Sequence, residues 1–239
     1  MRLDADALAA RVLAWYAVHG RDLPWRRTRD PYAILVSEVM LQQTQVERVR
    51  ERWTAWLERW PTPQALADAS RADVISAWQG LGYNRRAVNL HEAAKALARD
   101  GVPQDLAGWR ALPGVGPYTA AAVCALALDH DIVPVDVNIQ RIADRTGVGA
   151  IVPPPGRGHD LTQALFDLGA TVCLARIPRC DACPLADACP SRGRRYEPQR
   201  RQGRFEGSRR QARGRLLDRL REGPVAVADC DADIAAALV

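Results

Sequence analysis

The sequence predicts an all-helical fold. Ala, Leu and Arg, which favour helices, are abundant, whereas Phe occurs only twice and alternating β-branched residues are rare. Apolar residues recur at helical spacing near the N-terminus, at Leu8, Val12, Leu13 and Tyr16, and strand patterns are nearly absent throughout. The length of 239 residues suffices for one large domain or two small ones, each with a hydrophobic core.

Helical periodicity, together with capping and breaking residues, divides the chain into segments. The predicted helices are, in order, 6–19, 32–60 as one helix or two, 73–79, 86–99, 106–112, 118–128, one that begins after Asp136, 161–174 and 209–221. Gly20 ends the first of these, Pro61 stops the second, and Gly101 ends the fourth. Residues 21–31 form a loop rich in Arg and Asp, and Gly80-Leu81-Gly82 forms a tight turn. The helix at 118–128 contains small and apolar residues, which predicts a buried central element.

The positive charge is concentrated near the C-terminus. The net charge is +5, and residues 191–215 contain ten Arg and two Glu, a local balance of +8, so the rest carries −3 by subtraction. A basic segment on a near-neutral body indicates a polyanionic partner, although a solvated charged linker would have the same composition. Regular structure is predicted to end near Pro190, and residues 192–208 are predicted to form a polar linker.

The N-terminus carries no visible targeting signal. Residues 1–10 are acidic and polar, rather than basic and then apolar as in a signal peptide. No apolar run approaches the length of a membrane span. The sequence therefore predicts a cytoplasmic protein with no membrane partner.

Four cysteines lie close together, at Cys173, Cys180, Cys183 and Cys189, with the spacing C-x6-C-x2-C-x5-C. Disulfides are disfavoured in a cytoplasmic chain, which leaves a structural zinc or a [4Fe–4S] cluster as alternatives. Zinc ribbons usually have two C-x2-C pairs well apart, whereas this sequence has one pair in compact, unequal loops. The spacing therefore favours the iron–sulfur cluster. Cys124 lies in an apolar helix and is interpreted as a small core residue.

A glycine-rich turn joins the helices predicted at 106–112 and 118–128. In Leu112-Pro113-Gly114-Val115-Gly116 the two glycines permit positive φ, and Pro117 suits the first position of the next helix. Free backbone N–H groups at such a turn can bind a DNA phosphate without reading the base sequence. An ordinary helix-turn-helix corner would have the same pattern, so the turn alone leaves both interpretations open.

Asp136 follows Gly116 by twenty residues, in the segment Pro134-Val135-Asp136-Val137-Asn138. Its side chain is predicted to cap the helix that begins at Val137. A capping carboxylate can also take part in chemistry. Beside a sugar whose glycosidic bond is breaking, it would stabilise the oxocarbenium charge.

Several motifs occur in a consistent order along the chain. LPGVGPYTAAAV, VDVNIQR and the four-cysteine pattern follow one another, and together they resemble the endonuclease III superfamily. Within it, WYAVHGRDLPWR, SEVMLQQTQV and GLGYNRRAVNLH resemble the MutY-type adenine DNA glycosylases. The resemblance runs from about Trp15 to Cys189, which is most of the chain.

The resemblance implies two helical domains with the active-site cleft between them. Residues 21–130 would form a six-helix domain that contains the helix-hairpin-helix, and residues 1–20 and 131–190 would form a domain that holds a [4Fe–4S] cluster. Residues 191–239 would be a basic linker and a short helical tail, as in actinobacterial members. This implies a chain without the family's separate C-terminal, Nudix-like domain.

The resemblance also implies two catalytic carboxylates. Glu38 lies among Val36, Val39 and Met40, where partial desolvation would raise its pKa and suit it to general acid catalysis. In the family this residue protonates the flipped adenine and helps to activate water. A surface Glu on an amphipathic helix is the alternative interpretation. Asp136 would be the second carboxylate, which stabilises the sugar cation or bonds to it transiently.

Two further residues, Tyr118 and Asn138, match family positions that line the reacting sugar. The lyase members of the superfamily carry a Lys at the position of Tyr118, and that Lys forms a Schiff base. A Tyr cannot do so. The resemblance therefore implies a monofunctional glycosylase without strand cleavage.

Other matching residues would contact the DNA around the target. Gln43, Leu81 and Tyr83 match residues that insert into the stack near the opposite base, because a wedge must fill the gap that an extruded base leaves. Core packing is the alternative interpretation for Leu81 and Tyr83. Gly114 and Gly116 would bind phosphate through the hairpin backbone.

The pocket for adenine would include Arg21, Trp25 and Gln163. Their alternative interpretations are a surface salt bridge, a buried aromatic residue and an exposed polar residue. The pair Arg85-Arg86 either touches phosphate or is solvated. Trp53, Trp56, Trp60 and His91 lie at helical positions and are interpreted as packing or surface residues without a catalytic role.

The sequence departs from the family pattern in three ways that bear on the substrate. The resemblance implies that the domain which reads the opposite base is missing, Asn84 stands where the family usually has a second Tyr, and the span from Asp136 to Gln163 is shorter than usual. Val137 also replaces a common Gly, as a non-Gly residue does in archaeal thymine-mismatch relatives. From the resemblance as a whole, the predicted function is removal of adenine opposite 8-oxoguanine or guanine. The alternatives are a related glycosylase for mismatched thymine or hypoxanthine, and a non-catalytic iron–sulfur protein that binds DNA. The expected partner is double-stranded DNA with a mispaired or damaged base, bound by a monomer associated with the bacterial nucleoid.

Overall fold

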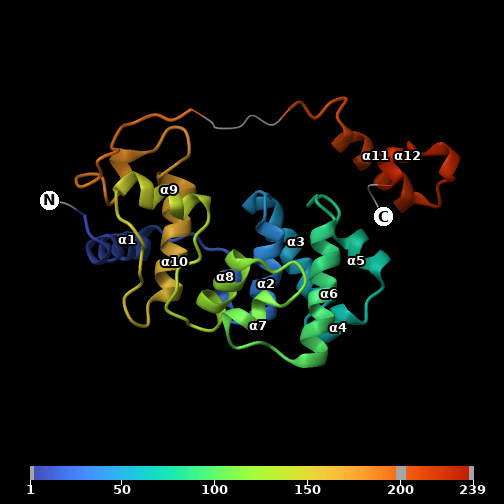
Figure 1. Ribbon diagram of the computed structural model, residues 1–239, viewed down its shortest axis with the longest axis horizontal. Coiled ribbons are helices and arrows are strands. Elements are labelled where there is room, and N and C mark those ends of the chain that lie inside the picture. The colour runs from blue at the N-terminus through green and yellow to red at the C-terminus, as the bar shows by residue number, and fades with distance from the viewer. Residues whose placement is uncertain (1–2, 198–202, 237–239) are drawn as a thin grey trace. The chain divides into compact units, whose positions relative to one another are not determined.

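The structure, a computed structural model, describes residues 3–197 and 203–236. No strand occurs among these residues, which confirms the predicted all-helical fold. The chain divides into two compact units, Met1–Tyr196 and Glu197–Val239. The helices of the first unit (Figure 1) are α1 Ala5–His19, α2 Pro31–Leu41, α3 Val46–Arg59, α4 Pro63–Ala67, α5 Arg71–Ala77, α6 Arg85–Asp100, α7 Leu106–Arg110, α8 Pro117–Ala127, α9 Val137–Thr146 and α10 Gly158–Asp167.

The predicted helices are found, with two differences. Of the two alternatives predicted for 32–60, the chain forms two helices, because a turn at residues 42–45 separates α2 from α3. Helix α4 is missing from the prediction, since it is a single short turn that Thr62 caps and Pro63 begins. The helix predicted at 161–174 starts earlier, and after Asp167 it widens into a π-helical turn at Leu168–Val172.

The first unit contains two hydrophobic cores. The buried residues of one lie between Leu23 and Leu126, in α2 to α8 and the segment before α2. Those of the other come from α1, α9, α10 and the segment up to Leu185. Helix α10 packs against α1, α9 and α8, and Phe166 contacts both cores. The domains predicted at 21–130 and at 1–20 with 131–190 put each core in a separate domain, and this division stays a prediction.

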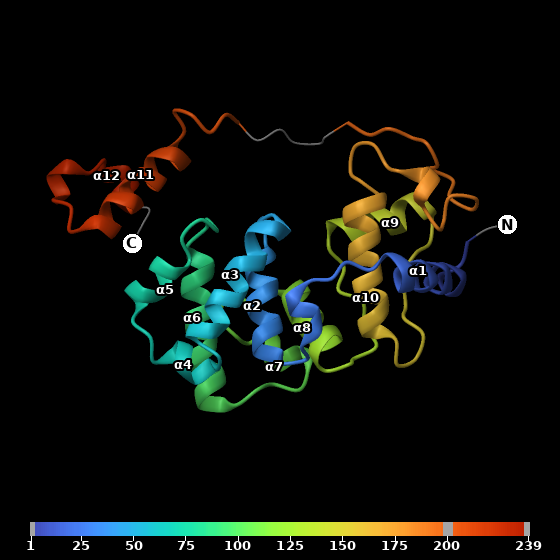
Figure 2. The ribbon, with the colours of Figure 1, turned by 180° about the vertical axis from the view of Figure 1, so that it is seen from behind.

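Helix α2 is the central element of the first core. Every residue from Tyr32 to Met40 is buried, and the helix packs against α3, α6 and α8, which surround it in Figures 1 and 2. Helix α8 is buried as predicted and includes Cys124. A helix that is apolar around its circumference belongs inside a protein, so a charged residue on α2 needs a specific reason.

The tryptophans of α3 have the packing role that the sequence predicts. Trp53 donates its Nε1–H to the carbonyl of Ala33 over 2.9 Å, which fixes α3 on α2. Trp56 packs edge-on against Trp60 and Trp78, an arrangement that aromatic quadrupoles favour. His91 is buried as well.

The second unit contains α11 Arg209–Glu222 and α12 Ala232–Ala236, which confirms the predicted helix at 209–221. Ser208 caps α11 by accepting from the N–H of Gln211. The two helices contact each other, and Leu216 and Ile234 are buried. The linker predicted at 192–208 lies partly outside the described residues.

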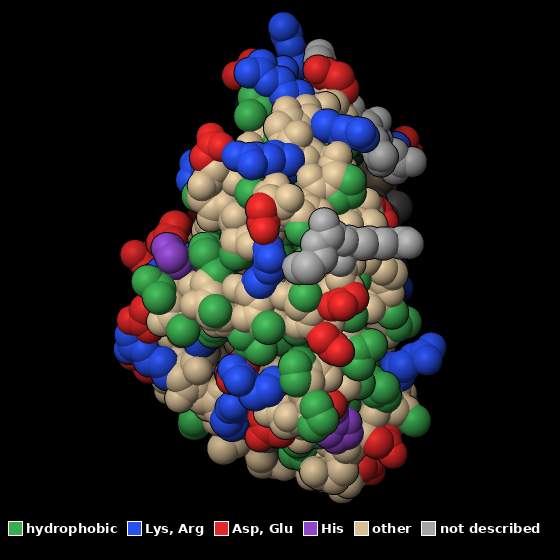
Figure 3. Space-filling model, turned by 90° about the vertical axis from the view of Figure 1, so that its left-hand side faces the viewer, with side chains coloured by type: hydrophobic (Ala, Val, Ile, Leu, Met, Phe, Trp, Pro, Cys, Tyr) green, Lys and Arg blue, Asp and Glu red, His purple; other side chains and the backbone are tan. Residues whose placement is uncertain are grey.

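In the part of the chain that the structure describes, no helix has both the length and the apolar character that crossing a membrane requires. On the face that Figure 3 shows, acidic and basic side chains are interspersed and hydrophobic side chains are scattered among them.

Candidate active site

Glu38 is the buried charge of α2. Its side chain lies in the middle of the helix with 4% of the residue exposed, so the interpretation as a surface Glu is wrong. The hydroxyl of Tyr118, near the start of α8, donates a hydrogen bond of 3.0 Å to Oε2 of Glu38. Burial raises the pKa of Glu38 to about 7, against the opposing effect of that hydrogen bond. Glu38 therefore carries its proton at a pH far above the usual range of a carboxyl group.

Asp136 caps α9, as predicted from the sequence. One oxygen, Oδ1, accepts the backbone N–H groups of Asn138 at 2.8 Å and Ile139 at 2.7 Å. The other, Oδ2, accepts the side-chain amide of Asn138 at 2.6 Å. The cap therefore fixes both oxygens of Asp136 at the N-terminal end of α9.

The two carboxylates belong to one electrostatic cluster, although they are far apart in the sequence. The negative charge of Asp136 contributes to the raised pKa of Glu38. The pKa of Tyr118 is raised by burial and by the charges of both carboxylates, so its hydroxyl stays protonated and donates. Helices α2 and α8 pack together and bring Glu38 and Tyr118 into contact, and the charge of Asp136, at the start of α9, acts on both groups.

Arg141 connects this cluster to the cysteine segment. Its Nη2 donates to Oδ1 of Asn138 at 2.9 Å and to the carbonyl of Gly169 at 2.8 Å. Its Nε donates to the carbonyl of Cys173 at 2.8 Å. Asn138, whose amide donates to Asp136, is thus linked through Arg141 to the backbone carbonyl of Cys173, the first of the four cysteines.

The predicted pocket residues lie where the two cores meet. Arg21 forms a salt bridge of 2.7 Å, but with the buried Asp167 rather than at the surface. Trp25 is 6% exposed and packs edge-on against Trp53, as expected for the buried aromatic alternative. Gln163 is 4% exposed, so its interpretation as an exposed polar residue is wrong. Their contacts with a base stay a prediction.

Sequence reasoning missed Arg26 and Asp167. Asp167 is fully buried and accepts from both Nη atoms of Arg26, at 2.8 Å and 2.6 Å, and from the backbone N–H of Arg21 at 2.8 Å. The charge of Arg26 acts on Glu38 and lowers its pKa. An Asp one helical turn after Gln163, in the apolar stretch Ala164-Leu165-Phe166, is the sequence signal from which a buried, paired carboxylate could have been predicted.

The predicted wedge residues differ in exposure. Gln43 is exposed, and Tyr83 is 51% exposed, so core packing is wrong for Tyr83. Leu81 is 4% exposed and packs in the first core, as its alternative interpretation expects. Gln43 and Tyr83 have φ of 55° and 48°, a region that non-glycine residues rarely adopt.

The hairpin turn lies between α7 and α8. Gly114 has φ of 74°, and a Cβ there would lie 2.5 Å from Cβ of Asn89, so only glycine fits. Gly116 caps α8 with an ordinary φ of −85°, so only one of the two glycines uses the positive φ that glycine permits. Pro117 begins α8, as predicted.

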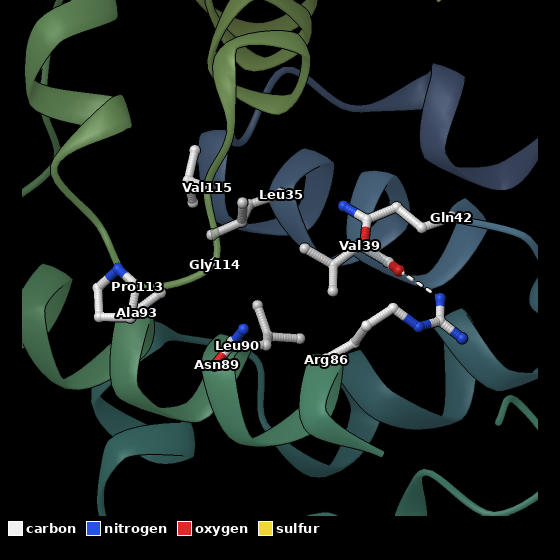
Figure 4. Close-up of a pocket in the computed structure, with 10 residues that line it drawn as sticks. All are labelled: Leu35, Val39, Gln42, Arg86, Asn89, Leu90, Ala93, Pro113, Gly114 and Val115. Carbon is white, nitrogen blue, oxygen red and sulfur yellow. Dashed lines mark hydrogen bonds between the residues drawn. The ribbon is translucent and has the colours of Figure 1, made fainter. Parts of the chain in front are cut away.

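A small hollow lies beside the hairpin and contains neither Glu38 nor Asp136. Figure 4 shows it between α2, α6 and the hairpin, with an apolar floor and three polar side chains, Gln42, Arg86 and Asn89. Arg86 points toward the carbonyl of Val39 in that view. Its guanidinium donates to backbone carbonyls, so the interpretation of Arg86 as a solvated side chain is wrong, whereas a phosphate contact of the Arg85-Arg86 pair stays a prediction.

The four cysteines line one apolar pocket, which Arg145 and Leu185 also line. The backbone N–H of Gly193 points at Sγ of Cys180 over 3.3 Å, and Nη1 of Arg145 points at Sγ of Cys173 over 3.4 Å. Such donors stabilise sulfur that carries negative charge. The described residues contain no group of three or more Cys, His, Asp or Glu arranged around a single metal ion.

Comparison with known proteins identifies the family. Residues 36–154 match the model of the HhH-GPD superfamily base excision DNA repair proteins. The chain is 45% identical to an adenine DNA glycosylase of Mycobacterium tuberculosis, over 94% of this chain and 82% of that protein. It is 36% identical to the adenine DNA glycosylase of Homo sapiens, over 80% of this chain and 40% of that protein.

Solved structures have the same fold. A thermostable thymine-DNA glycosylase is similar with a TM-score of 0.72 and 28% identity, over 78% of this chain and 95% of that one. A trapped endonuclease III–DNA covalent intermediate is similar in fold, with a TM-score of 0.68 over 79% of this chain and 96% of that one. The chain therefore belongs to the adenine DNA glycosylase family within the HhH-GPD superfamily.

Proposed function

We propose that this chain is a monofunctional glycosylase of base excision repair that hydrolyses the N-glycosidic bond of adenine opposite 8-oxoguanine or guanine in double-stranded DNA. The observation that carries the proposal is the cluster of Glu38, Tyr118 and Asp136, in which burial raises the pKa of Glu38 to about 7 and three N–H donors fix the carboxyl group of Asp136. Adenine as the target follows from the names of the relatives.

Glu38 has the properties of a general acid. A pKa of about 7 lets it hold a proton at neutral pH and release it to a base whose basicity increases as the glycosidic bond weakens. The Tyr118 hydrogen bond fixes Oε2, so the carboxyl group has one orientation for proton donation. Once ionised, the same group can accept a proton from the attacking water.

Asp136 has the properties of a stabiliser of positive charge. Its three hydrogen bonds hold the carboxylate in one position before the reaction begins, which avoids reorganisation in the transition state. Positive charge develops on the deoxyribose as adenine departs, and a fixed anion beside it lowers the barrier. The two acids thus act on opposite ends of the same bond.

The absence of strand cleavage is supported by the lysine content. The sequence contains a single lysine, Lys95, on the outer face of α6, where it pairs with Glu92 at 2.9 Å. Tyr118 occupies the position that carries the Schiff-base lysine in the lyase members that this sequence resembles. An imine requires an amine nitrogen, which the phenol of Tyr118 does not have. Hydrolysis by water is therefore the expected reaction.

The cysteine pocket fits a [4Fe–4S] cluster held by Cys173, Cys180, Cys183 and Cys189. These four thiolates would hold such a cluster, which would cross-link the segment that follows α10 and supply an electron-transfer group. Arg141 and Arg145 hold this segment against α9 through the carbonyls of Cys173 and Leu174. The same segment thus supports the helix that Asp136 caps.

The experiment that tests the function is excision from a panel of duplexes. Each duplex carries A, T or hypoxanthine opposite 8-oxoguanine or guanine, and abasic sites are revealed by alkali. We expect adenine release, with strand breaks only after alkali. Release of thymine or hypoxanthine without adenine would contradict the substrate, and breaks before alkali would contradict the monofunctional reaction.

A further inference from the structure

Two turns on the first core expose side chains from unusual backbone conformations. Gln43 lies between α2 and α3 with φ of 55°, and Tyr83 lies just before α6 with φ of 48°. Both side chains are exposed. Non-glycine residues adopt this region only where the surrounding structure holds them, and such positions cluster at binding sites.

Arg86 lies between these two turns and donates to both. Its guanidinium is surrounded by acceptors from the end of α2, from the turn after it and from the turn before α6. The contacts are Nη1 to the carbonyls of Val39 (2.7 Å) and Met40 (3.1 Å), and Nη2 to Oγ1 of Thr44 (3.1 Å) and the carbonyls of Leu81 (2.9 Å) and Gly82 (3.0 Å).

The hydrogen-bond partners of the Arg86 guanidinium are all neutral groups. No carboxylate pairs with it among the described residues, and its Nε is buried without a partner. Its guanidinium also lies over the rings of Trp78, at 5.3 Å, and Tyr83, at 5.7 Å. The guanidinium thus gives its hydrogen bonds to backbone carbonyls instead of to a carboxylate. Such an arrangement holds the carbonyls, and the backbone that carries them, in fixed positions.

Thr44 completes the connection. Its hydroxyl contacts the carbonyl of Gln42 at 3.3 Å and lies 3.4 Å from the carbonyl of Leu81. Trp78 Nε1–H donates to the carbonyl of Gly82 at 3.0 Å, so that turn is held from its other side. The planar fork of Arg86 thus reaches the end of α2 and both turns.

We propose that Arg86 is a positioning residue that joins the turns of Gln43 and Tyr83 into a single rigid element for entering DNA beside the target base. This inference rests on the proposed function. The carbonyls of Val39 and Met40 follow Glu38 directly on α2, so the same guanidinium links the wedge side chains to the helix of the general acid. Lysine cannot replace it, because one ammonium does not span both turns.

The first test needs no DNA. Hydrogen–deuterium exchange is measured on peptides that cover residues 42–45 and 80–84 in the wild type and in Arg86→Ala, Arg86→Lys and Arg85→Ala, each checked for a folded state by its thermal transition. We expect both segments to exchange at least about tenfold faster in the two Arg86 variants, since the loss of about 1.4 kcal/mol of protection is tenfold. Arg85 is the exposed neighbour on α6, and its variant should exchange like the wild type in both segments. Faster exchange in only one segment, or wild-type exchange in Arg86→Lys, would overturn the proposal.

The second test uses a duplex with 2-aminopurine in place of the target adenine, whose fluorescence rises when the base leaves the stack. Arg86→Ala should lower both the fluorescence rise and the single-turnover excision rate from the matching adenine duplex, the latter by on the order of 100-fold. The salt dependence of binding should keep the wild-type slope, whereas a slope smaller by about one would mean a lost phosphate contact and would overturn the proposal. If the wild type releases no adenine, the proposed function fails, and the exchange experiment still decides on the coupling.

Discussion

The Tyr118 hydroxyl and the Glu38 carboxyl group form a 3.0 Å hydrogen bond between the buried helices α8 and α2. The bond stabilises the ionised form of a carboxyl group that burial keeps protonated. The balance of these two effects leaves the pKa of Glu38 near 7, and the pH dependence of catalysis should report it.

The first prediction concerns the pH profile. Glu38 has to be protonated to act as an acid, so the single-turnover excision rate should fall as pH rises through about 7. The measurement is the rate between pH 6 and 9 on a duplex with A opposite 8-oxoguanine, as an order-of-magnitude test of that pKa. A rate that rises across this range would contradict the role of Glu38 as the acid.

The same pKa predicts a gain in stability for Glu38→Gln. A folded-state pKa above the unfolded value favours folding only while the group is protonated. The contribution is therefore complete below pH 4.5 and is lost as pH rises through about 7. At pH 8 the wild type keeps a buried negative charge that Gln lacks, and the variant should be more stable by up to about 3 kcal/mol. Denaturant titrations of both proteins at pH 5 and pH 8 measure the difference in their free energies of unfolding. The same difference at both pH values would contradict the raised pKa of Glu38.

The third prediction concerns Tyr118→Phe. Removing the hydroxyl removes a hydrogen bond that lowers the pKa of Glu38, so the alkaline limb of the rate profile should move to higher pH. The ring of Tyr118 packs against Phe166, and the variant keeps that contact. A limb at unchanged or lower pH would mean that the bond does not affect Glu38.

The buried Asp167 provides a fourth prediction. Asp167→Asn leaves Arg26 and Arg21 without a counter-charge where the two cores meet, and should lower the free energy of unfolding by about 3–5 kcal/mol. Asp187 forms an ion pair with Arg11 but is 69% exposed, so Asp187→Asn is the matched control, with an expected loss of at most about 1 kcal/mol. Equal losses in the two variants would show that burial does not matter to the Asp167 pair.

The fifth prediction concerns the cysteines. The protein as purified under anaerobic conditions should be brown, with about four iron and four sulfide per chain. Cys183→Ser should lose both colour and iron, whereas Cys124→Ser, in the apolar helix α8, should keep them. A colourless wild type with one zinc per chain would favour the alternative metal.

The fold and the local features of the site follow from the sequence, because they depend on neighbouring residues. Apolar neighbours predict the burial of Glu38, and the position of Asp136 before a helix predicts its cap. The pairing of Asp167 with Arg21 spans 146 residues, and no local pattern specifies it. The positive φ of Gln43 is invisible in the sequence for a different reason, since no glycine marks a position where a non-glycine residue adopts this conformation.

The most direct test of the account is single-turnover excision by the wild type, Glu38→Gln and Asp136→Asn on a duplex with A opposite 8-oxoguanine, with binding to the same duplex measured in parallel. The wild type should release adenine, and each variant should bind the duplex yet lose at least about 1,000-fold in rate, the usual scale for a removed catalytic group. Full activity in either variant would contradict the central claim that these two acids act together on one nucleotide.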